Sequence, residues 1–173
     1  MKLSPLFSTE EIQKEVKKMA QQINKFYGNK EIVIIGVLKG AFIFYTDLIK
    51  QLEQNIICDF CSVSFYGNFK KASASAFLSL DIRTPIKEKD VLLVDCIADH
   101  GHSLNFIKKI LEQRKPKSIK TACLVVKPQA LKNIQIDFQG FQVEQESFIV
   151  GYGIDYKNQG RNLNYFSQLE DLN

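Results

Sequence analysis

One stretch, residues 91–104, constrains the fold of this chain more than any other: Val-Leu-Leu-Val-Asp-Cys-Ile-Ala-Asp-His-Gly-His-Ser-Leu. Its four leading apolar residues predict a strand that is buried on both faces, as in a parallel sheet. Two acids, Asp95 and Asp99, follow, and Gly101 lies in a tight turn. A helical pattern then starts at Ser103 and runs to the next proline. The stretch therefore predicts a strand, a turn and a helix, with carboxylates at the carboxyl end of the strand.

This arrangement suggests a phosphate site. Open parallel sheets bind their ligands at the carboxyl ends of the strands. A glycine-containing loop before a helix presents backbone N–H groups, backed by the helix dipole, to a phosphate. Carboxylates beside a phosphate indicate Mg²⁺ or sugar hydroxyls. The simpler alternative is an ordinary strand–helix turn with solvated acids. Composition alone does not separate the two, but the order of the residues favours the phosphate site.

The rest of the chain alternates between strand and helix patterns. Ser8-Thr9-Glu10-Glu11 forms a capping box that begins a helix, and Gly28 ends it. Further strands are predicted at 32–37, 56–66, 76–80, 118–126, 138–143 and 148–152, and a further helix runs from 41 to about 52. This alternation favours an α/β fold with a parallel sheet and crossover helices. Residues 68–75 are small and polar, so we expect them to be mobile.

Length and composition set broad limits. A chain of 173 residues fits one domain, residues 1–173, with a sizeable core. The net charge of +4 favours anionic ligands, but the basic residues are dispersed, which does not favour nucleic acid. No apolar run approaches the length of a membrane span, and no apolar segment follows the first residues as in a signal peptide. We therefore expect a cytoplasmic protein without a membrane partner. The absence of a GxGxxG fingerprint counts against a dinucleotide enzyme.

The cysteines stand at positions 58, 61, 96 and 123, and we expect reduced thiols. Cys58 and Cys61 have the spacing of a redox pair, but they lie in a predicted strand, where residues three apart point to opposite faces. A zinc site that combines cysteines with His100 and His102 is a second alternative. This cysteine pair and the histidine pair lie far apart in the sequence, so a zinc site is no more favoured than a redox role.

The stretch 91–104 resembles the phosphoribosyl-diphosphate (PRPP) signature of the type I phosphoribosyltransferases. That signature has four apolar residues, two acids, two apolar residues and then Asp-Thr/Ser-Gly-x-Thr-Leu. The residues that fit it are Asp99, Gly101 and Leu104. Asp95 stands for the first acid, which is commonly Glu, whereas Cys96 replaces the second acid. His100 stands where the family has a small hydroxyl residue, and Ser103 stands in place of Thr.

Four further blocks make most of the chain similar to the hypoxanthine-guanine phosphoribosyltransferases of bacterial type. They are Leu38-Lys39-Gly40, Ser64-Phe65-Tyr66-Gly67, Lys127-Pro128, and Phe148 to Tyr156 with Arg161-Asn162-Leu163. The last block belongs to the enzymes that act on 6-oxopurines. The resemblance implies the type I phosphoribosyltransferase fold, in which helices flank a parallel core sheet and segments from the two chain ends form a small hood. It also implies a homodimer or homotetramer.

The resemblance assigns a role to each block. PRPP and its phosphate would be bound by Asp95, Asp99, His100, Gly101, His102 and Ser103, and pyrophosphate by Lys39, Gly40 and Arg161. Asp99 would be the general acid/base near purine N7, with a turn cap as the alternative. Asp155 and Asp95 would hold Mg²⁺. Phe65 and Tyr66 would begin a lid, although the family usually has Ser at position 65.

The implied purine site consists of Lys127, Phe148, Ile149 and Asp155. Lys127 would donate to the oxygen at purine C6, and an amine cannot accept from the amino group of adenine. Phe148 would stack on the base, and Ile149 would offer its backbone carbonyl. Without the resemblance, Lys127 would be interpreted as a surface residue, Phe148 as core, and Asp155 and Arg161 as loop charges.

The favoured function is purine salvage: hypoxanthine or guanine reacts with PRPP to give the nucleoside monophosphate and pyrophosphate, with Mg²⁺. One alternative is a catalytically impaired PRPP- or nucleotide-binding protein, motivated by Cys96 and Phe65. Another is a nucleic-acid-binding regulator on the same fold. A thiol is a poor ligand for a hard cation, so Cys96 would weaken the contact to ribose and Mg²⁺. Alternatively, residue 96 faces the core.

Overall fold

The computed structural model describes residues 2–66 and 75–170. Within these ranges the chain forms, in order, β1 (Leu3–Phe7), α1 (Thr9–Tyr27), β2 (Ile32–Leu38), α2 (Phe42–Ile49), β3 (Ile56–Tyr66), β4 (Ser75–Leu80), β5 (Asp90–Ala98), α3 (His102–Glu112), β6 (Ser118–Val126), the short 3-10 helix η1 (Ala130–Lys132), β7 (Phe138–Gln142), β8 (Ile149–Val150) and β9 (Phe166–Leu169).

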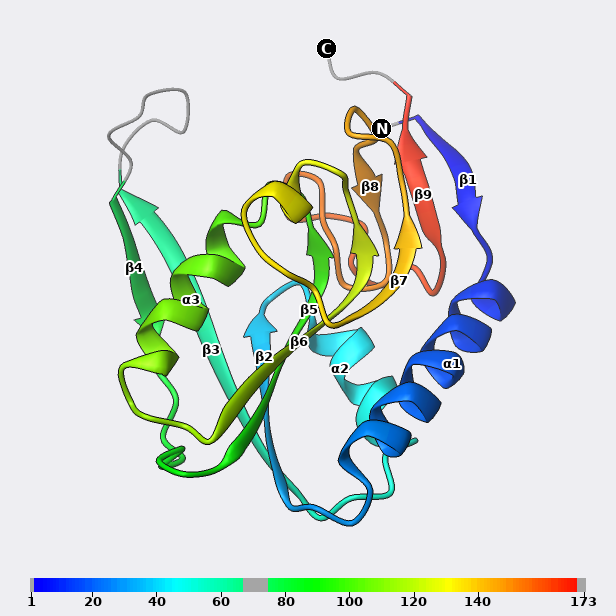
Figure 1. Cartoon of the computed structure of the whole chain (residues 1–173). Coiled ribbons are helices and arrows are strands. Elements are labelled where there is room, and N and C mark those ends of the chain that lie inside the picture. Colours follow the sequence, from blue (N-terminus) through cyan, green and yellow to red (C-terminus); the bar gives the residue numbers. More distant parts are fainter. Residues whose placement is uncertain (1, 67–74, 171–173) are drawn as a thin grey trace.

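The main sheet has the strand order β4-β3-β2-β5-β6-β7. Five neighbouring strands of this sheet run parallel to one another, in the order β3-β2-β5-β6-β7. Strand β4 is an antiparallel edge strand beside β3. Helices α1 and α2 cover one face of this sheet and α3 covers the other (Figure 1). The predicted α/β class with a parallel core sheet is confirmed.

Strand β5 lies in the middle of the sheet, and its side chains alternate between two buried cores. Leu92 and Val94 pack in the core beneath α1 and α2, whereas Val91 and Leu93 pack in the core beneath α3. All four are fully buried. Because both faces are covered, the strand is an uninterrupted apolar run instead of an alternation of apolar and polar residues.

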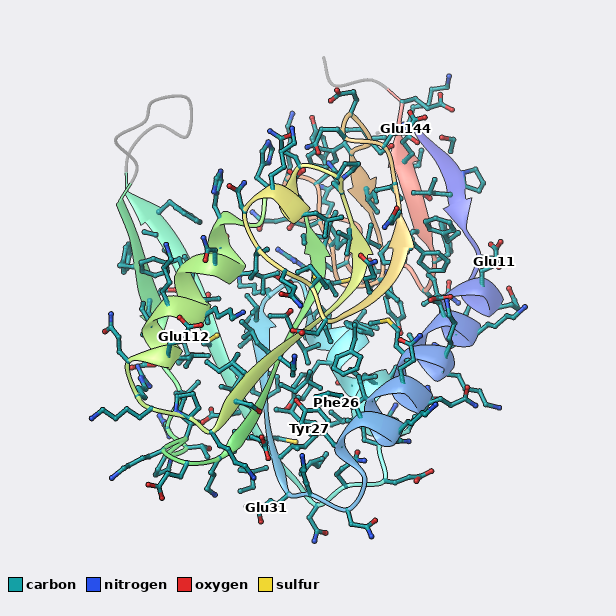
Figure 2. All side chains as sticks on the ribbon, viewed as in Figure 1. Glu11, Phe26, Tyr27, Glu31, Glu112 and Glu144 are labelled. Carbon is teal, nitrogen blue, oxygen red and sulfur yellow. The ribbon has the colours of Figure 1, made fainter. Side chains whose placement is uncertain are left out.

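Helix α1 begins as its sequence predicts. The Ser8 side chain accepts from the backbone N–H of Glu11, and the Glu11 carboxylate accepts from the N–H of Ser8, which completes the capping box. Glu11 marks this end of the helix in Figure 2. Gly28, at a φ of 56°, ends the helix as predicted. The capping box satisfies two backbone donors that would otherwise lack partners.

A second, antiparallel sheet forms the hood and joins the two ends of the chain, with the strand order β1-β9-β8 (Figure 1). The resemblance implied such a hood, but sequence periodicity did not locate β1 or β9. Strand β1 contains Pro5 and is only partly buried, and β9 has four residues. Both strands are too short for a pattern to stand out.

Several element boundaries differ from the predictions. Helix α2 ends at Ile49, not near residue 52. The strand predicted over 148–152 is limited to β8, because Gly151 and Tyr152 have φ values of 114° and 47° and turn the backbone away. Strand β5 continues to Ala98, so Asp95 lies inside the strand and not after it. Most of the segment predicted to be mobile, 68–75, lies outside the described residues.

The two cysteines of β3 point in opposite directions, as predicted. Cys58 is exposed and Cys61 is buried, on opposite sides of β3. Within residues 2–66 and 75–170, no three His, Cys, Asp or Glu side chains gather as a metal site, so the zinc alternative has no support there. In the same ranges, no helix combines the length and apolar character needed to cross a bilayer.

Candidate active site

A pocket of about 300 Å³ opens where β5 passes into α3. It is lined by Phe65, Asp95, Ile97, Ala98, Asp99, His100, Gly101, His102, Ser103 and Leu104. The predicted PRPP-binding residues therefore line one cavity together. Phe65, at the end of β3, forms part of its wall, whereas the Tyr66 side chain lies outside the described residues.

The turn before α3 requires glycine. Gly101 has a φ of 76°, and a Cβ there would lie 2.8 Å from Ile134 Cγ2 and 3.0 Å from the Ala130 carbonyl oxygen. Gly101 is the N-cap of α3, and no side chain of the described residues caps that helix end. The first N–H groups of α3 are therefore available to an anion, with the helix dipole behind them.

Asp99 makes contacts across the pocket mouth and does not cap the helix. Its Oδ1 lies 2.9 Å from Lys127 Nζ and accepts a hydrogen bond from Gln145 Nε2 at 3.2 Å. Its Oδ2 lies 3.4 Å from His100 Nδ1. The Lys127 side chain is only 7% exposed. Both simpler interpretations, a turn cap at Asp99 and a surface lysine at Lys127, are therefore wrong.

Asp95 lines the floor of the pocket and lies near the predicted pyrophosphate loop. Its Oδ1 accepts from the N–H of Cys96 at 2.7 Å. Burial raises the pKa of the Asp95 carboxyl to about 7, although the N–H donors of Cys96 and Ile97 act in the opposite direction. A Cβ on Gly40 would lie 4.0 Å from Asp95 Oδ1, so the loop with Lys39 and Gly40 faces this acid. The Leu38–Lys39 peptide bond is cis.

Cys96 points away from the pocket. It is fully buried in the core beneath α1 and α2, and its Sγ lies 3.6 Å from the Tyr152 carbonyl oxygen. Burial raises the pKa of the Cys96 thiol. Because neighbouring strand residues face opposite sides of a sheet, Asp95 and Cys96 cannot both face the pocket. The hypothesis of a missing sugar ligand at residue 96 is therefore contradicted, and the alternative that it faces the core is confirmed.

The loop after β8 brings two predicted charges together. Arg161 Nη2 lies 2.5 Å from Asp155 Oδ1, and Arg161 Nη1 donates to the Gly153 carbonyl at 2.7 Å. A Cβ on Gly153 would lie 2.3 Å from the Gly40 carbonyl oxygen, so the two backbones touch. The segment with Arg161 and the segment with Lys39 and Gly40, far apart in the sequence, therefore meet beside Asp95.

Comparison with known proteins identifies this arrangement. The sequence model of the family described as "Phosphoribosyl transferase domain" matches residues 4–157. The chain belongs to the phosphoribosyltransferase family. The predicted PRPP signature and the α/β fold are thus those of the family.

Similar proteins narrow the relationship. The chain is 40% identical over 166 residues to the hypoxanthine-guanine phosphoribosyltransferase of Bacillus subtilis, covering 95% of this chain and 92% of the relative. It is 39% identical over 172 residues to the enzyme of that name from Aquifex aeolicus, covering 98% and 96%. A crystal structure of a hypoxanthine-guanine phosphoribosyltransferase from Bacillus anthracis, with HEPES in its active site, has a TM-score of 0.90 at 38% identity. It covers 96% of this chain and 98% of that one.

The predicted purine residues of this phosphoribosyltransferase lie outside the lining of the 300 Å³ pocket. Phe148 is half-buried and packs edge-on against Tyr156, with ring centroids 5.4 Å apart. Ile149 is buried in β8, which pairs with β9. Lys127 connects this side to the pocket through Asp99.

Sequence reasoning missed Gln145 in this phosphoribosyltransferase. Its Nε2 donates to Asp99, and its Oε1 accepts from the N–H of Gln129 at 3.2 Å. Gln145 lies in a polar connection without periodicity, so no sequence signal distinguishes it from its neighbours. His100 and His102 were predicted to bind the phosphate of PRPP. Both are exposed, and their rings stack with centroids 6.0 Å apart.

Proposed function

We propose that this phosphoribosyltransferase transfers the phosphoribosyl group of PRPP to hypoxanthine or guanine, which yields IMP or GMP and pyrophosphate in purine salvage. The observation that carries the proposal is the pair of Lys127 and Asp99. A buried ammonium lies 2.9 Å from a carboxylate at the pocket mouth, so a donor and a proton acceptor stand side by side. A 6-oxopurine presents the matching groups, a carbonyl at C6 and a ring nitrogen at N7.

In this proposal Asp99 is the general acid/base at purine N7. A positioned carboxylate can exchange a proton with a ring nitrogen within hydrogen-bond reach. Lys127 donates to the C6 oxygen, which an adenine amino group cannot replace because it does not accept from an ammonium. Gln145 supports Asp99 through its hydrogen bond. Phe148 and Ile149 would form the wall against which the base lies.

The phosphate of PRPP would bind the loop of His100, Gly101, His102 and Ser103. Support comes from the uncapped N–H groups of α3 and from the positive φ of Gly101. The two exposed imidazoles can donate to phosphate oxygens from the pocket rim. Asp95, on the floor, would hold the ribose hydroxyls.

Pyrophosphate would be held between the Lys39–Gly40 segment and Arg161. The transition state carries growing negative charge on this leaving group, and pre-placed donors stabilise it. Planar guanidinium suits bidentate phosphate binding, so Arg161 would exchange its Asp155 partner for the substrate.

Magnesium is the proposed cofactor, and the donors present fit it. Asp155 or Asp95 can supply a carboxylate oxygen, and Mg²⁺ commonly takes one or two carboxylates, with substrate phosphates and water as its other ligands. When bound, the ion would neutralise charge on the pyrophosphate.

Four further expectations remain predictions: one domain over residues 1–173, a lid that begins at Phe65 and Tyr66, a homodimer or homotetramer, and a cytoplasmic location. The alternative of an impaired binding protein has lost its main motive, because Cys96 faces the core. We therefore do not propose it.

A PRPP-dependent assay tests the proposed function. Hypoxanthine, guanine, xanthine and adenine would each be supplied with PRPP and Mg²⁺, and formation of the nucleoside monophosphate would be followed. Hypoxanthine or guanine should be converted and adenine should not. Equal or faster conversion of adenine would overturn the assignment.

A further inference from the structure

A buried tyrosine ties the hood to the core beside the proposed pyrophosphate site. Tyr152 lies two residues after the end of β8 and is 2% exposed. Its hydroxyl donates to Asp47 Oδ2 on α2 at 2.7 Å, across 105 positions of the sequence. The ring packs edge-on against Phe166 of β9, with centroids 5.6 Å apart. The side chain therefore connects α2 with the hood sheet.

The Asp47 carboxylate is a strong acceptor for this hydroxyl. It also accepts from Gln13 Nε2 of α1 at 3.1 Å and lies 3.2 Å from Lys50 Nζ. Burial alone would raise the pKa of Asp47, but these donors, led by the Tyr152 hydroxyl, lower it below its usual value. Hydrogen bonds to a charged acceptor are shorter and stronger than neutral ones.

The backbone around Tyr152 is held in an unusual conformation. Its φ of 47° lies in the left-handed region, which a bulky residue adopts only when its surroundings enforce it. The Tyr152 N–H donates to the Leu163 carbonyl at 2.8 Å, and the Tyr152 carbonyl accepts a hydrogen bond from the Cys96 thiol. The preceding residue, Gly151, passes close to Tyr165, because a Cβ on Gly151 would lie 2.0 Å from the Tyr165 carbonyl oxygen.

The next residue, Gly153, connects Tyr152 to Arg161, which pairs with Asp155. Its carbonyl accepts from Arg161 Nη1 at 2.7 Å, and its N–H donates to the Arg161 carbonyl at 3.0 Å. It also touches Gly40, which precedes α2 by two positions. Helix α2 thus carries the Gly40 loop at its start and the Tyr152 partner, Asp47, near its end.

We propose that Tyr152 is a positioning residue for pyrophosphate: its hydrogen bond to Asp47 fixes Gly153 against Gly40 and so sets the spacing between Gly40 and Arg161. This inference rests on the proposed function. The purine side has an independent support, because Ile149 pairs with Gln168 and the Phe148 carbonyl accepts from Leu169 at 2.8 Å. Loss of the hydroxyl should therefore weaken binding of pyrophosphate and spare binding of the purine.

The test is Tyr152→Phe, which removes one oxygen and keeps the ring. The matched control is Tyr27→Phe. Tyr27 is equally buried, and its hydroxyl donates to the Val91 carbonyl at 3.3 Å. It lies at the end of α1 that is remote from the hood (Figure 2). Both variants lose a buried hydroxyl, but the control loses it far from the loop of residues 151–161.

In Tyr152→Phe, the Kd of pyrophosphate in the presence of Mg²⁺, measured by calorimetry, should rise on the order of tenfold, as expected for one hydrogen bond to a charged group. The KM of pyrophosphate in the reverse reaction with IMP should rise in parallel, and the KM of hypoxanthine should change less than about twofold. Tyr27→Phe should leave all three within about twofold. Equal losses in both variants, or equal losses for pyrophosphate and hypoxanthine, would overturn the inference.

Two further measurements separate this inference from the proposed function. Amide hydrogen exchange of residues 151–161 should accelerate in Tyr152→Phe but not in Tyr27→Phe, whether or not the protein turns over PRPP. If Asp47 acts through the tyrosine, adding Asp47→Ala to Tyr152→Phe should cause no further loss of pyrophosphate affinity. A wild-type protein without turnover would refute the proposed function alone. A folded Tyr152→Phe protein with unchanged exchange and unchanged pyrophosphate binding would refute the positioning role.

Discussion

The Lys127 ammonium and the Asp99 carboxylate lie 2.9 Å apart, and the lysine side chain is 7% exposed while the aspartate side chain is 50% exposed. A buried charge is costly unless it is paired, so the exposed carboxylate stabilises the lysine at the pocket mouth. The pair is therefore placed before any substrate binds. Its geometry leads to two predictions, one for each partner.

Lys127→Met should lower kcat/KM for hypoxanthine by about 10- to 100-fold, the range expected for one lost hydrogen bond from a charged donor. Methionine fills similar buried volume, and Asp99 can turn to water, so stability should change little. The measurement is steady-state kinetics with hypoxanthine and adenine. Lys132→Met removes a nearby exposed lysine of η1 and should leave kcat/KM for hypoxanthine unchanged. Unaltered kinetics in Lys127→Met would show that this amine does not contact the base.

Asp99→Asn should reduce turnover by at least about 100-fold, a typical contribution of a general acid/base. Binding of IMP should survive, because the N–H groups of the phosphate loop are unchanged. Turnover and IMP affinity are measured on the same sample. Asp81→Asn is the control, since Asp81 pairs with Arg114 away from the pocket. Wild-type turnover in Asp99→Asn would remove the proposed catalytic role.

Much of the fold was predictable because its signals are local. The apolar run of β5, the capping box at Ser8 and the glycine at 28 each determine a short segment through nearby residues. Two hood strands, β1 and β9, gave no comparable signal. Strand β1 pairs with β9 through residues such as Leu3 and Leu169, which meet only after the chain has folded.

The candidate site was predictable as segments but not as contacts. Asp95 and residues 97–103 come from the end of β5 and the turn that follows it, so their common pocket follows from the strand and turn that hold them. The direction of the Cys96 side chain depends on whether β5 continues past its apolar start at residues 91–94. The strand does continue, as far as Ala98, so residue 96 alternates into the core. The partner of Tyr152 lies 105 positions away, and no spacing rule predicts such a contact.

Asp59 should contribute stability that depends on pH. On β3, its carboxylate accepts from the N–H groups of Phe60, Arg83 and Thr84 at 2.7 to 2.8 Å. Burial alone would raise the pKa of Asp59, but these donors, led by Thr84, lower it. Because the folded value lies below the unfolded one, the contribution is present above the unfolded pKa. It is lost as pH falls through the folded pKa.

Asp59→Asn should therefore lower the free energy of unfolding by about 1 kcal/mol at pH 7, a figure that allows for solvent screening. The difference from wild type should shrink as pH falls below about 4, where the wild-type carboxylate takes up its proton. Urea unfolding at a series of pH values measures this. A difference that stays constant down to pH 3 would mean that the carboxylate charge is not what holds the segment with Arg83 and Thr84.

Cys96→Asp should destabilise the protein instead of restoring a ligand. An aspartate there would enter the core beneath α1 and α2, where the side chain is fully buried and faces the Tyr152 carbonyl oxygen. Two acceptors would then oppose each other without a donor, which should cost about 3 kcal/mol or more. The same change at Cys58, which is exposed on β3, should cost only about 0.5 kcal/mol.

Thermal unfolding and the dependence of rate on Mg²⁺ and PRPP should be measured on the same samples of Cys96→Asp and Cys58→Asp. Only the first should lose stability, and neither should need less Mg²⁺ or PRPP, because residue 96 does not line the pocket. The contrary result is well defined. A stable Cys96→Asp protein that reaches half-maximal rate at a lower PRPP concentration would mean that an acid at this position reaches the ribose. Strand β5 would then have to rotate its side chains near Asp95 when the substrate binds.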